Sequence, residues 1–459
     1  MPVAIGDTLV GAFAAGSADH LGGFDLDQLL ELQVDRLTDQ IDTITSAKRV
    51  EQFGQGSSDR ADSGQPIVCF SSWCALGGTH RESRRWPHGV VDPRAAPRTH
   101  HLTGRSSTAP RYPRPVRIGV LTSGGDCPGL NAVIRALVRV VERVHGGTVI
   151  GFRNGFRGVL NDESEVLDVA RCRGILPRGG TIIGTSREQP YTQPDGVERV
   201  RSAIDRHALD GLVVVGGEGS LSCAADLVGD GVPCVGIPKT IDNDVVGTEL
   251  TFGFDTAVSI CSAAIDRLHT TAEAHDRVMI VEVMGRHVGH IALRAGIAGG
   301  ATMVLVPEVP FDIAEIASSL RRRHAGSSFA SIVVVAEGAV PAAGGLVVPD
   351  YEVDEFNHQR LGGISSVLAE AIEERIGIET RVTMLGHVQR GGTPTAFDRV
   401  LATRFGAAAA DAAAAGSWGS MVGLQSDRIV EVPLSEVARR RKTIDLDVYE
   451  RVARPFFAS

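Results

Sequence analysis

Two carboxylates, a threonine and a lysine follow an apolar stretch near the middle of this 459-residue chain. Val232 to Ile237 predicts a buried strand, and Pro238-Lys239-Thr240-Ile241-Asp242-Asn243-Asp244 continues from its carboxyl end. Ligands of open parallel sheets bind at that edge. An aspartate there can take a proton from a hydroxyl, and a lysine or threonine beside it can bind a phosphate. We interpret Asp242 as the general base of a phosphoryl transfer; the alternative is that the two acids only cap the next turn.

Two other predicted strands also end in Gly-rich turns that precede helical patterns. Val116 to Leu121 is followed by Thr122-Ser123-Gly124-Gly125-Asp126, and Gly211 to Val215 by Gly216-Gly217-Glu218-Gly219-Ser220. Glycines let backbone N–H groups approach a phosphate, and the helix N-terminus adds a favourable potential. Glu218 offers a carboxylate to Mg²⁺, which prefers few protein ligands together with water and phosphate oxygens. The turn after Val116 to Leu121 is neither a dinucleotide fingerprint nor a Walker loop.

Two arginines on Gly-rich segments lie between these turns. Arg178 precedes Gly179-Gly180, and Arg187 follows Gly184-Thr185-Ser186. A cation on such a loop suits a polyphosphate, and a solvent-exposed arginine is the alternative. Three consecutive strand-to-helix turns can thus place phosphate- or metal-binding groups at one sheet edge, which together predict a polyphosphate site.

The second half of the chain repeats the pattern of a buried strand followed by polar residues. Val278 to Val283 leads to Met284-Gly285-Arg286-His287, Ser331 to Val335 leads to Glu337, and Val382 to Leu385 leads to His387-Val388-Gln389-Arg390. A dianionic ligand needs several fixed cationic donors, and arginine suits it best.

Helical patterns cover Ala257 to Ala274 and the Ala-rich stretch Ala407 to Ala415. His290 and His358 lie near polar turns, and we interpret both as structural or solvent-exposed.

Length and composition limit the class of protein. A chain of this length has room for roughly two or three domains, and its plentiful Gly and few aromatics favour a Gly-looped α/β enzyme. The formal charge of -9 argues against nucleic-acid binding by the whole chain. Seven scattered cysteines without a C-x-x-C pair indicate reduced thiols in a cytoplasmic protein. Met1 to Ser17 lacks the basic region of a secretory signal, and no apolar run is long enough to span a membrane.

Residues 1–115 differ from the rest of the chain. Phe24 to Ile44 has apolar residues at helical spacing and predicts one amphipathic helix. Gly54 to Gly64 is rich in Ser, Gly and Asp, and His80 to Arg117 is rich in Arg and Pro. Such segments cannot bury enough surface to fold, so we expect a largely disordered extension; the alternative is an Arg-rich nucleic-acid patch. No methionine lies between Met1 and Met279, which leaves open a translation start inside this region.

Five segments together resemble the 6-phosphofructokinases: "IGVLTSGGDCPGLNAVIR", "GGEGS", "PKTIDND", "MGRHVGHIA" and "LGHVQRGGTPTAFDR". Their order and spacing match that family from about Val116 to about Gly423, although "GGEGS" alone also fits NAD and lipid kinases. The resemblance implies an α/β fold of two doubly wound Rossmann-like lobes with the active site in the cleft between them. It implies a nucleotide-binding lobe at 116–252, completed by about 388–430, and a sugar-phosphate lobe at 253–387, completed by about 431–459.

The resemblance also implies a reaction, in which a phosphoryl group passes to the 1-hydroxyl of fructose 6-phosphate and gives fructose 1,6-bisphosphate in glycolysis. By matching position, the expected catalytic residues are Thr240, Asp242 and Arg286. The expected nucleotide contacts are Gly125, Arg187, Gly217, Glu218, Gly219 and Ser220. Glu218 is the expected Mg²⁺ ligand, at a position where the family more often has Asp.

The same carry-over places the sugar phosphate in the second half. Its expected contacts, besides Thr240 and Asp242, are Arg277, Met284, Gly285, Arg286, Glu337, Arg381, His387 and Arg390. Two of these, Arg277 and Arg381, are expected to act across an interface, so the family implies a homotetramer with shared active sites. Two cations, Arg135 and Arg267, match a family effector site, but Thr302 stands where that site has a glutamate. The effector therefore stays open.

Two positions disagree on the phosphoryl donor. In the family, an aspartate at the position of Gly219 accompanies pyrophosphate, whereas a glycine leaves room for ATP. Lys239 stands where bacterial ATP-dependent enzymes usually have glycine and pyrophosphate-dependent enzymes have lysine. Steric exclusion is the harder constraint, because ATP could also use the charge of a lysine. We therefore predict ATP, with a pyrophosphate-dependent enzyme and a catalytically silent nucleotide-binding subunit as the alternatives.

Overall fold

The computed structural model describes residues 115–326, 330–342 and 363–455. The predicted helix Phe24 to Ile44, the rest of the expected extension up to residue 114, and His358 lie outside the described residues. None of the described helices has the length and apolar character needed to cross a membrane.

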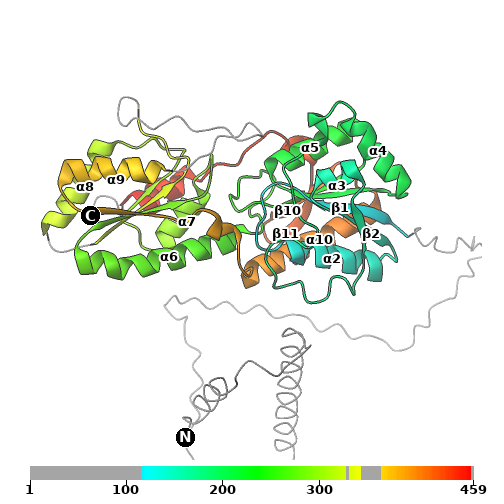
Figure 1. The fold of residues 1–459 in the computed structure, drawn as a ribbon, viewed down its shortest axis with the longest axis horizontal. Helices are drawn as coiled ribbons and strands as arrows, with labels where there is room; N and C mark the ends of the chain where they lie inside the picture. The colour runs from blue at the N-terminus through cyan, green and yellow to red at the C-terminus, as the bar shows by residue number, and fades with distance from the viewer. Residues whose placement is uncertain (1–114, 327–329, 343–362, 456–459) are drawn as a thin grey trace, which may run out of the picture. The chain divides into compact units, whose positions relative to one another are not determined.

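Seven strands form the first sheet, in the order β11-β10-β5-β4-β1-β2-β3 (Figure 1). They are β1 (Arg117–Thr122), β2 (Thr148–Phe152), β3 (Ser164–Leu167), β4 (Gly211–Gly216), β5 (Cys234–Pro238), β10 (Ser420–Gln425) and β11 (Arg428–Pro433). The five inner strands run parallel, and the antiparallel β3 and β11 form the two edges. Because helices cover both faces of the sheet, the central strands are apolar without alternation, and β4 is buried at every residue.

Two sets of helices cover this sheet. One set consists of α2 (Leu130–Arg143) and α10 (Ala396–Ala415), which pack against each other. The other consists of α3 (Phe156–Asn161), α4 (Gly196–Arg206), α5 (Glu218–Gly229) and α11 (Leu434–Val437), whose apolar residues form a separate cluster. Neighbouring residues of β1 point to opposite faces of the sheet. Val120 packs in the core with α2 and α10, and Leu121 packs in the cluster with α3, α4, α5 and α11.

Four parallel strands form the second sheet, in the order β7-β8-β6-β9. They are β6 (Val278–Val283), β7 (Met303–Leu305), β8 (Ser331–Ala336) and β9 (Thr380–Met384). Its helices are α6 (Phe254–His275), α7 (His290–Ala298), α8 (Ile313–Gly326) and α9 (Ile364–Ile376). Figure 1 shows α8 and α9 on one side of this sheet and α6 and α7 on the other. The core under α6 and α7 is continuous with the core under α2 and α10, so one apolar cluster joins the two sheets.

Short elements complete the described chain: η1 (Pro190–Thr192), η2 (Gly386–Arg390), α12 (Leu446–Val448) and the π-helical turn η3 (Tyr449–Ala453). Near the carboxyl end, the hydroxyl of Tyr449 donates to Val304 O at 3.1 Å and joins this segment to β7. The first sheet extends to Pro433, and α11 packs on α5.

The predicted α/β fold with two lobes is confirmed, whereas several helix starts are predicted too late. α6 begins at Phe254 instead of Ala257, and α10 begins at Ala396 instead of Ala407. The hydroxyl of Thr395 caps α10 by accepting from Asp398 N at 3.2 Å. A cap of this kind fixes where a helix starts more strongly than the Ala-rich composition further along it.

Candidate active site

The carboxyl ends of β1, β4 and β5 meet at one edge of the first sheet. The register pairs Thr122 with Val215, and Gly216 with Pro238, so the three turns predicted from the sequence start side by side. Two of the turns touch, because the Ser220 hydroxyl donates to the Ser123 hydroxyl at 3.0 Å. Both serines are buried, and their contact fixes the spacing between the two Gly-rich turns.

The segment that carries Arg187 holds the turn after β1 in place. Gly124 N donates to Ser186 O at 2.8 Å, and the hydroxyl of Thr185 donates to Gly124 O at 2.6 Å. These two bonds keep the expected nucleotide contacts Gly125 and Arg187 on neighbouring segments.

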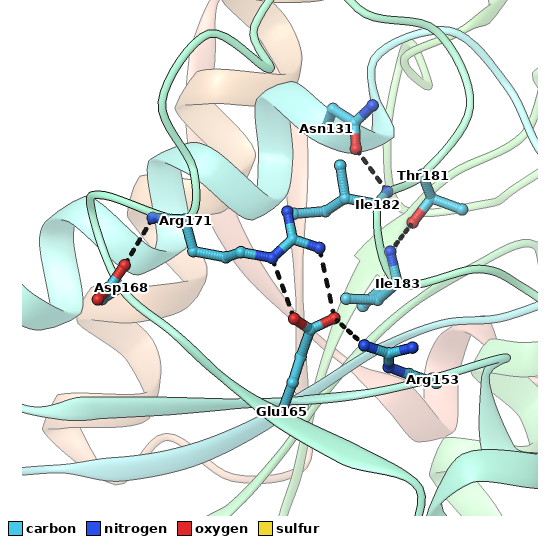
Figure 2. A network of polar contacts seen from close by, with 8 residues as sticks. All are labelled: Asn131, Arg153, Glu165, Asp168, Arg171, Thr181, Ile182 and Ile183. Atoms are coloured by element: carbon cyan, nitrogen blue, oxygen red, sulfur yellow. Dashed lines mark hydrogen bonds and ion pairs between the residues drawn. The ribbon is translucent and has the colours of Figure 1, made fainter. Parts of the chain in front are cut away.

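Asn131, the second residue of α2, holds the preceding part of the same segment. Its Oδ1 accepts from Ile182 N at 2.9 Å, and its Nδ2 donates to Arg178 O and Gly179 O, both at 3.1 Å. Figure 2 shows the Asn131–Ile182 bond beside an ion-pair cluster, in which Glu165 binds two arginines. The arginine-bearing segment is therefore fixed by a side chain of α2.

Two cations lie against the Gly-rich turn after β1. Lys239, 3% exposed, donates from Nζ to Gly125 O. Arg390 reaches the same turn from η2 and donates from Nη1 to Asp126 O at 3.1 Å. Burial lowers the pKa of Lys239. The residue expected at the sugar 6-phosphate, Arg390, thus contacts the expected nucleotide loop.

Asp242 lies in the turn after β5 with one oxygen available. The backbone N–H of Asp242 donates to the hydroxyl oxygen of Thr240 at 3.0 Å. The side-chain oxygen Oδ1 of Asp242 is buried and has no hydrogen-bond partner among the described residues. Burial raises the pKa of the Asp242 carboxyl, and the charges of Arg390, Lys239 and Arg286 oppose that increase. The last of these cations follows a strand of the second sheet, so groups from both sheets act on this carboxylate.

A second carboxylate, Asp244, lies beside the first. Burial and the charge of Asp242 raise the pKa of Asp244 to about 6, and Arg441 Nε lies 4.0 Å from its Oδ2. Two neighbouring acids in a partly buried turn cannot both ionise without cost, so their protonation is coupled.

Glu218, Gly219 and Ser220 form the first turn of α5. Glu218 Oε1 accepts from the hydroxyl of Ser222 at 3.0 Å. This bond holds the carboxylate against the first turn of α5, near the helix N-terminus, where the dipole favours a negative group. Gly219 is exposed, and a Cβ placed there would meet within 4 Å a single atom of the described chain, Gln189 Nε2 at 3.7 Å. Space is therefore open at this position, and Gly217 lies beside it, next to Thr240.

The carboxyl edge of the second sheet holds Met284, Gly285, Arg286 and Glu337. Glu337 Oε1 accepts from Arg286 N at 3.2 Å, and burial together with the charge of Asp242 raises the pKa of Glu337 to about 7. Gly285 has φ 137°, a backbone conformation that favours glycine. Because Arg286 and Glu337 both act electrostatically on Asp242, the structure brings these predicted site residues toward the turn after β5.

Gln389 is a site residue that sequence reasoning did not single out. Its side chain is fully buried, accepts from Met284 N and the Cys261 thiol, both at 3.1 Å, and donates to Gly386 O at 3.0 Å. It therefore ties η2 to the end of β6, while His387 on η2 stays exposed. A glutamine in a polar stretch carries no periodic signal of burial, although its place between His387 and Arg390 could have drawn attention to it.

Arg277 and Arg381 lie at the other edge of the second sheet. Both bind the carboxylate of Glu379, with Arg277 Nη2 at 3.2 Å from it. Arg277 precedes β6 and Met284 follows it, a separation of roughly 20 Å along an extended strand. Within one chain, therefore, these two arginines are not brought together with Met284, Gly285 and Arg286.

The fold and this edge geometry describe a two-lobed α/β protein with Gly-rich, acidic and basic turns at its strand ends. Comparison with known families agrees, because the family model described as Phosphofructokinase matches residues 117–413. The chain belongs to the phosphofructokinase family.

Similar proteins differ in the donor that their names give. A pyrophosphate–fructose 6-phosphate 1-phosphotransferase of Streptomyces coelicolor is 53% identical over 338 residues, which cover 73% of this chain and 98% of that protein. An ATP-dependent 6-phosphofructokinase of Mycobacterium tuberculosis (strain H37Rv) is 51% identical over 339 residues, 74% of this chain and 99% of that protein.

Solved structures give the same family. The T-state phosphofructokinase of Pichia pastoris superposes with a TM-score of 0.60 at 33% identity, covering 72% of this chain and 36% of that one. A pyrophosphate-dependent phosphofructokinase from Marinobacter aquaeolei shares the fold, with a TM-score of 0.62 at 23% identity, covering 75% of this chain and 92% of that one.

Proposed function

We propose that this chain transfers a phosphoryl group from ATP to the 1-hydroxyl of fructose 6-phosphate, with Asp242 as general base. The observation that carries the proposal is the buried Oδ1 of Asp242, which lacks a partner among the described residues and is influenced by three cations. A buried carboxylate oxygen without a donor is costly unless a ligand supplies one. A substrate hydroxyl would donate there and lose its proton to the carboxylate.

Positioning and charge neutralisation do most of the work in such a transfer. Burial makes the carboxylate of Asp242 a stronger proton acceptor, while Lys239, Arg286 and Arg390 favour its ionised form. Lys239 and Arg286 would also stabilise the negative charge of the transferred phosphoryl group. A base of this kind contributes about 10²–10⁴-fold to the rate.

Mg²⁺, when bound, supplies positive charge to the donor phosphates. Glu218 would hold it, since Oε1 accepts one hydrogen bond from Ser222 and Oε2 accepts none from the described residues. No three His, Cys, Asp or Glu side chains of the described chain form a metal cluster. A single carboxylate fits Mg²⁺, which usually takes its other ligands from phosphates and water.

The sugar phosphate would lie along the second sheet's carboxyl edge. Met284, Gly285, Arg286 and Glu337 would contact the sugar, and His387 with Arg390 would bind its 6-phosphate. Arg277 and Arg381 would come from a neighbouring subunit of a homotetramer, which agrees with their place at the far end of β6 and β9. We expect the enzyme to work in the cytoplasm.

ATP is our proposed donor because of the space at Gly219. Gln189 Nε2 is the one described atom near a Cβ built at that position, so no side chain crowds the place where the α-phosphate of ATP would lie. Pyrophosphate is the second candidate, supported by Lys239 beneath the Gly-rich turn and by the name of the Streptomyces coelicolor relative.

The test is a coupled assay of the purified chain with fructose 6-phosphate, Mg²⁺ and either ATP or pyrophosphate. We expect kcat/KM with ATP to exceed kcat/KM with pyrophosphate by at least about tenfold, a difference of about 1.4 kcal/mol in the activation free energy. A kcat/KM with pyrophosphate that exceeds the kcat/KM with ATP would show that pyrophosphate is the donor. ATP binding without turnover of either donor would indicate a catalytically silent subunit.

A further inference from the structure

Lys442 reaches the turn that carries Asp242 from near the carboxyl end of the chain. Its Nζ donates three hydrogen bonds, to Asn243 Oδ1 at 3.0 Å and to Thr248 O and Glu249 O, both at 2.9 Å. An ammonium group has three donors, so this set uses all of them. Burial lowers the pKa of Lys442 to about 8, as expected for an ammonium group withdrawn from water.

The backbone around Lys442 holds the same turn. Lys442 N donates to Asp244 O at 2.8 Å, and Val245 and Arg441 form an antiparallel bridge. On the other side, the ring of His290 binds Lys442 O at 3.1 Å, so the lysine is itself fixed to α7. Residues 441–442 therefore join the turn after β5 to a helix of the second sheet.

Asn243 is the residue through which this contact reaches the proposed base. It is 4% exposed and adopts φ 53°, a left-handed conformation that is uncommon outside glycine. Its Oδ1 accepts from both Lys442 Nζ and Thr251 N, the latter at 3.1 Å. Such a conformation persists when surrounding contacts determine it, and Asp242 is the adjacent residue in the chain.

We propose that Lys442 is a positioning residue for phosphoryl transfer, which fixes the left-handed Asn243 and thereby the orientation of the Asp242 carboxylate. This inference rests on the proposed role of Asp242. No hydrogen bond or ion pair joins Lys442 to Asp242 among the described residues, so Lys442 acts through Asn243 and the backbone of Asp244. A displacement of about 1 Å at a reacting group can cost about 100-fold in rate.

Lys442→Met tests the proposal, because methionine keeps an apolar stem of similar length and removes the ammonium group. We expect kcat to fall about 10- to 100-fold while the KM for the donor changes less than about threefold. Arg440→Met is the matched control: this exposed arginine contacts Glu436 O, and its loss should leave kcat unchanged. A kcat of Lys442→Met within about threefold of wild type would overturn the proposal.

A second variant covers the case in which Lys442→Met does not fold. Asn243→Gly keeps the left-handed backbone accessible and removes the side chain that binds Lys442 Nζ, Thr251 N and Glu249 O, so we expect the same selective loss of kcat. In the double variant, the combined loss should be smaller than the sum of the two single losses, because both variants break the bond between Lys442 and Asn243. Additive losses would show a purely structural role. So would a kcat loss that is seen only at temperatures where the single variants unfold and that disappears when cooling restores their fold.

Asp242→Asn, measured in the same assay, separates the proposed role of Asp242 as general base from the proposed positioning role of Lys442. If it abolishes turnover while Lys442→Met and Asn243→Gly keep wild-type kcat, the positioning role is wrong and the proposed base stands. If Asp242→Asn keeps wild-type turnover, the proposed base fails and the positioning role fails with it.

Discussion

Glu337, at the tip of the second sheet, lies close enough to Asp242 of the first sheet for one charge to act on the other. Burial, and then the charge of Asp242, raises the pKa of Glu337 to about 7. The two carboxylates come from strands that belong to different sheets, and Arg286 N binds Glu337 at 3.2 Å. Acids with different environments in one site commonly divide the roles of binding and proton transfer, so here Asp242 would accept the proton and Glu337 would hydrogen-bond the sugar.

This relationship predicts how stability depends on pH. An acid whose pKa is raised by folding stabilises the folded chain below its ordinary value of 4.5, and that contribution is lost as the pH rises through about 7. Glu337→Gln should therefore lessen the decline in the free energy of unfolding between pH 4.5 and 7 by on the order of 1 kcal/mol. Urea unfolding across this range measures it, with the exposed Glu374→Gln as control. Equal declines in wild type and Glu337→Gln would contradict the raised pKa.

The open space at Gly219 predicts that a larger side chain there would prevent the use of ATP. Gly219→Asp puts a negative side chain where the α-phosphate of ATP would lie, so kcat/KM for ATP should fall at least about 100-fold by steric and electrostatic exclusion. Steady-state kinetics with ATP check this. Gly229→Asp, at the other end of α5 with nothing within 4 Å, is the matched control. ATP kinetics that survive Gly219→Asp would refute the steric argument.

The buried Gln389 predicts a joint effect on stability and sugar binding. Gln389→Leu leaves Met284 N and Gly386 O without their partner, which should cost about 2–4 kcal/mol of unfolding free energy and raise the KM for fructose 6-phosphate. Gln389→Glu keeps the acceptor for Met284 N and, when its carboxyl is protonated, a donor for Gly386 O, so it should lose less than Gln389→Leu at acidic pH. Urea unfolding and substrate kinetics together measure both effects. Identical behaviour of the two variants would show that this bond has no role.

The place of Arg277 and Arg381 predicts complementation between subunits. If they act on a neighbour's site, mixing Asp242→Asn subunits with Arg277→Met subunits should restore activity that neither variant has alone. The restored site would take its base from one subunit and its arginine from the other. The measurement is turnover after the two variants are unfolded and refolded together. Mixtures no more active than the sum of the separate variants would indicate that each chain forms its own complete site.

Much of the fold could be predicted from the sequence because its central strands are buried on both faces. Runs such as "GLVVV" and "VMIVEV" stand out from flanking Gly and polar residues, and β6 was predicted at its observed bounds. Helix starts were less predictable, since α10 depends on a cap at Thr395 and α5 continues directly from a Gly-rich turn. Local caps decide such boundaries, and composition further along the helix does not.

The candidate site could be predicted where its residues directly follow strands. Asp242, Glu218 and Glu337 all lie at strand ends, and a parallel sheet brings those ends together. Lys442 could not be predicted, because it lies about 200 residues from Asn243 in a basic run that looks solvent-exposed, and its contact exists only after both lobes fold.

Turnover of Asp242→Asn tests the central claim most directly. The amide keeps the size of the side chain but cannot accept the proton of the sugar hydroxyl. With fructose 6-phosphate, Mg²⁺ and the better of the two donors, we predict that kcat falls about 10²–10⁴-fold while the variant stays folded and its KM for the donor is nearly unchanged. A kcat within about threefold of wild type would contradict the account.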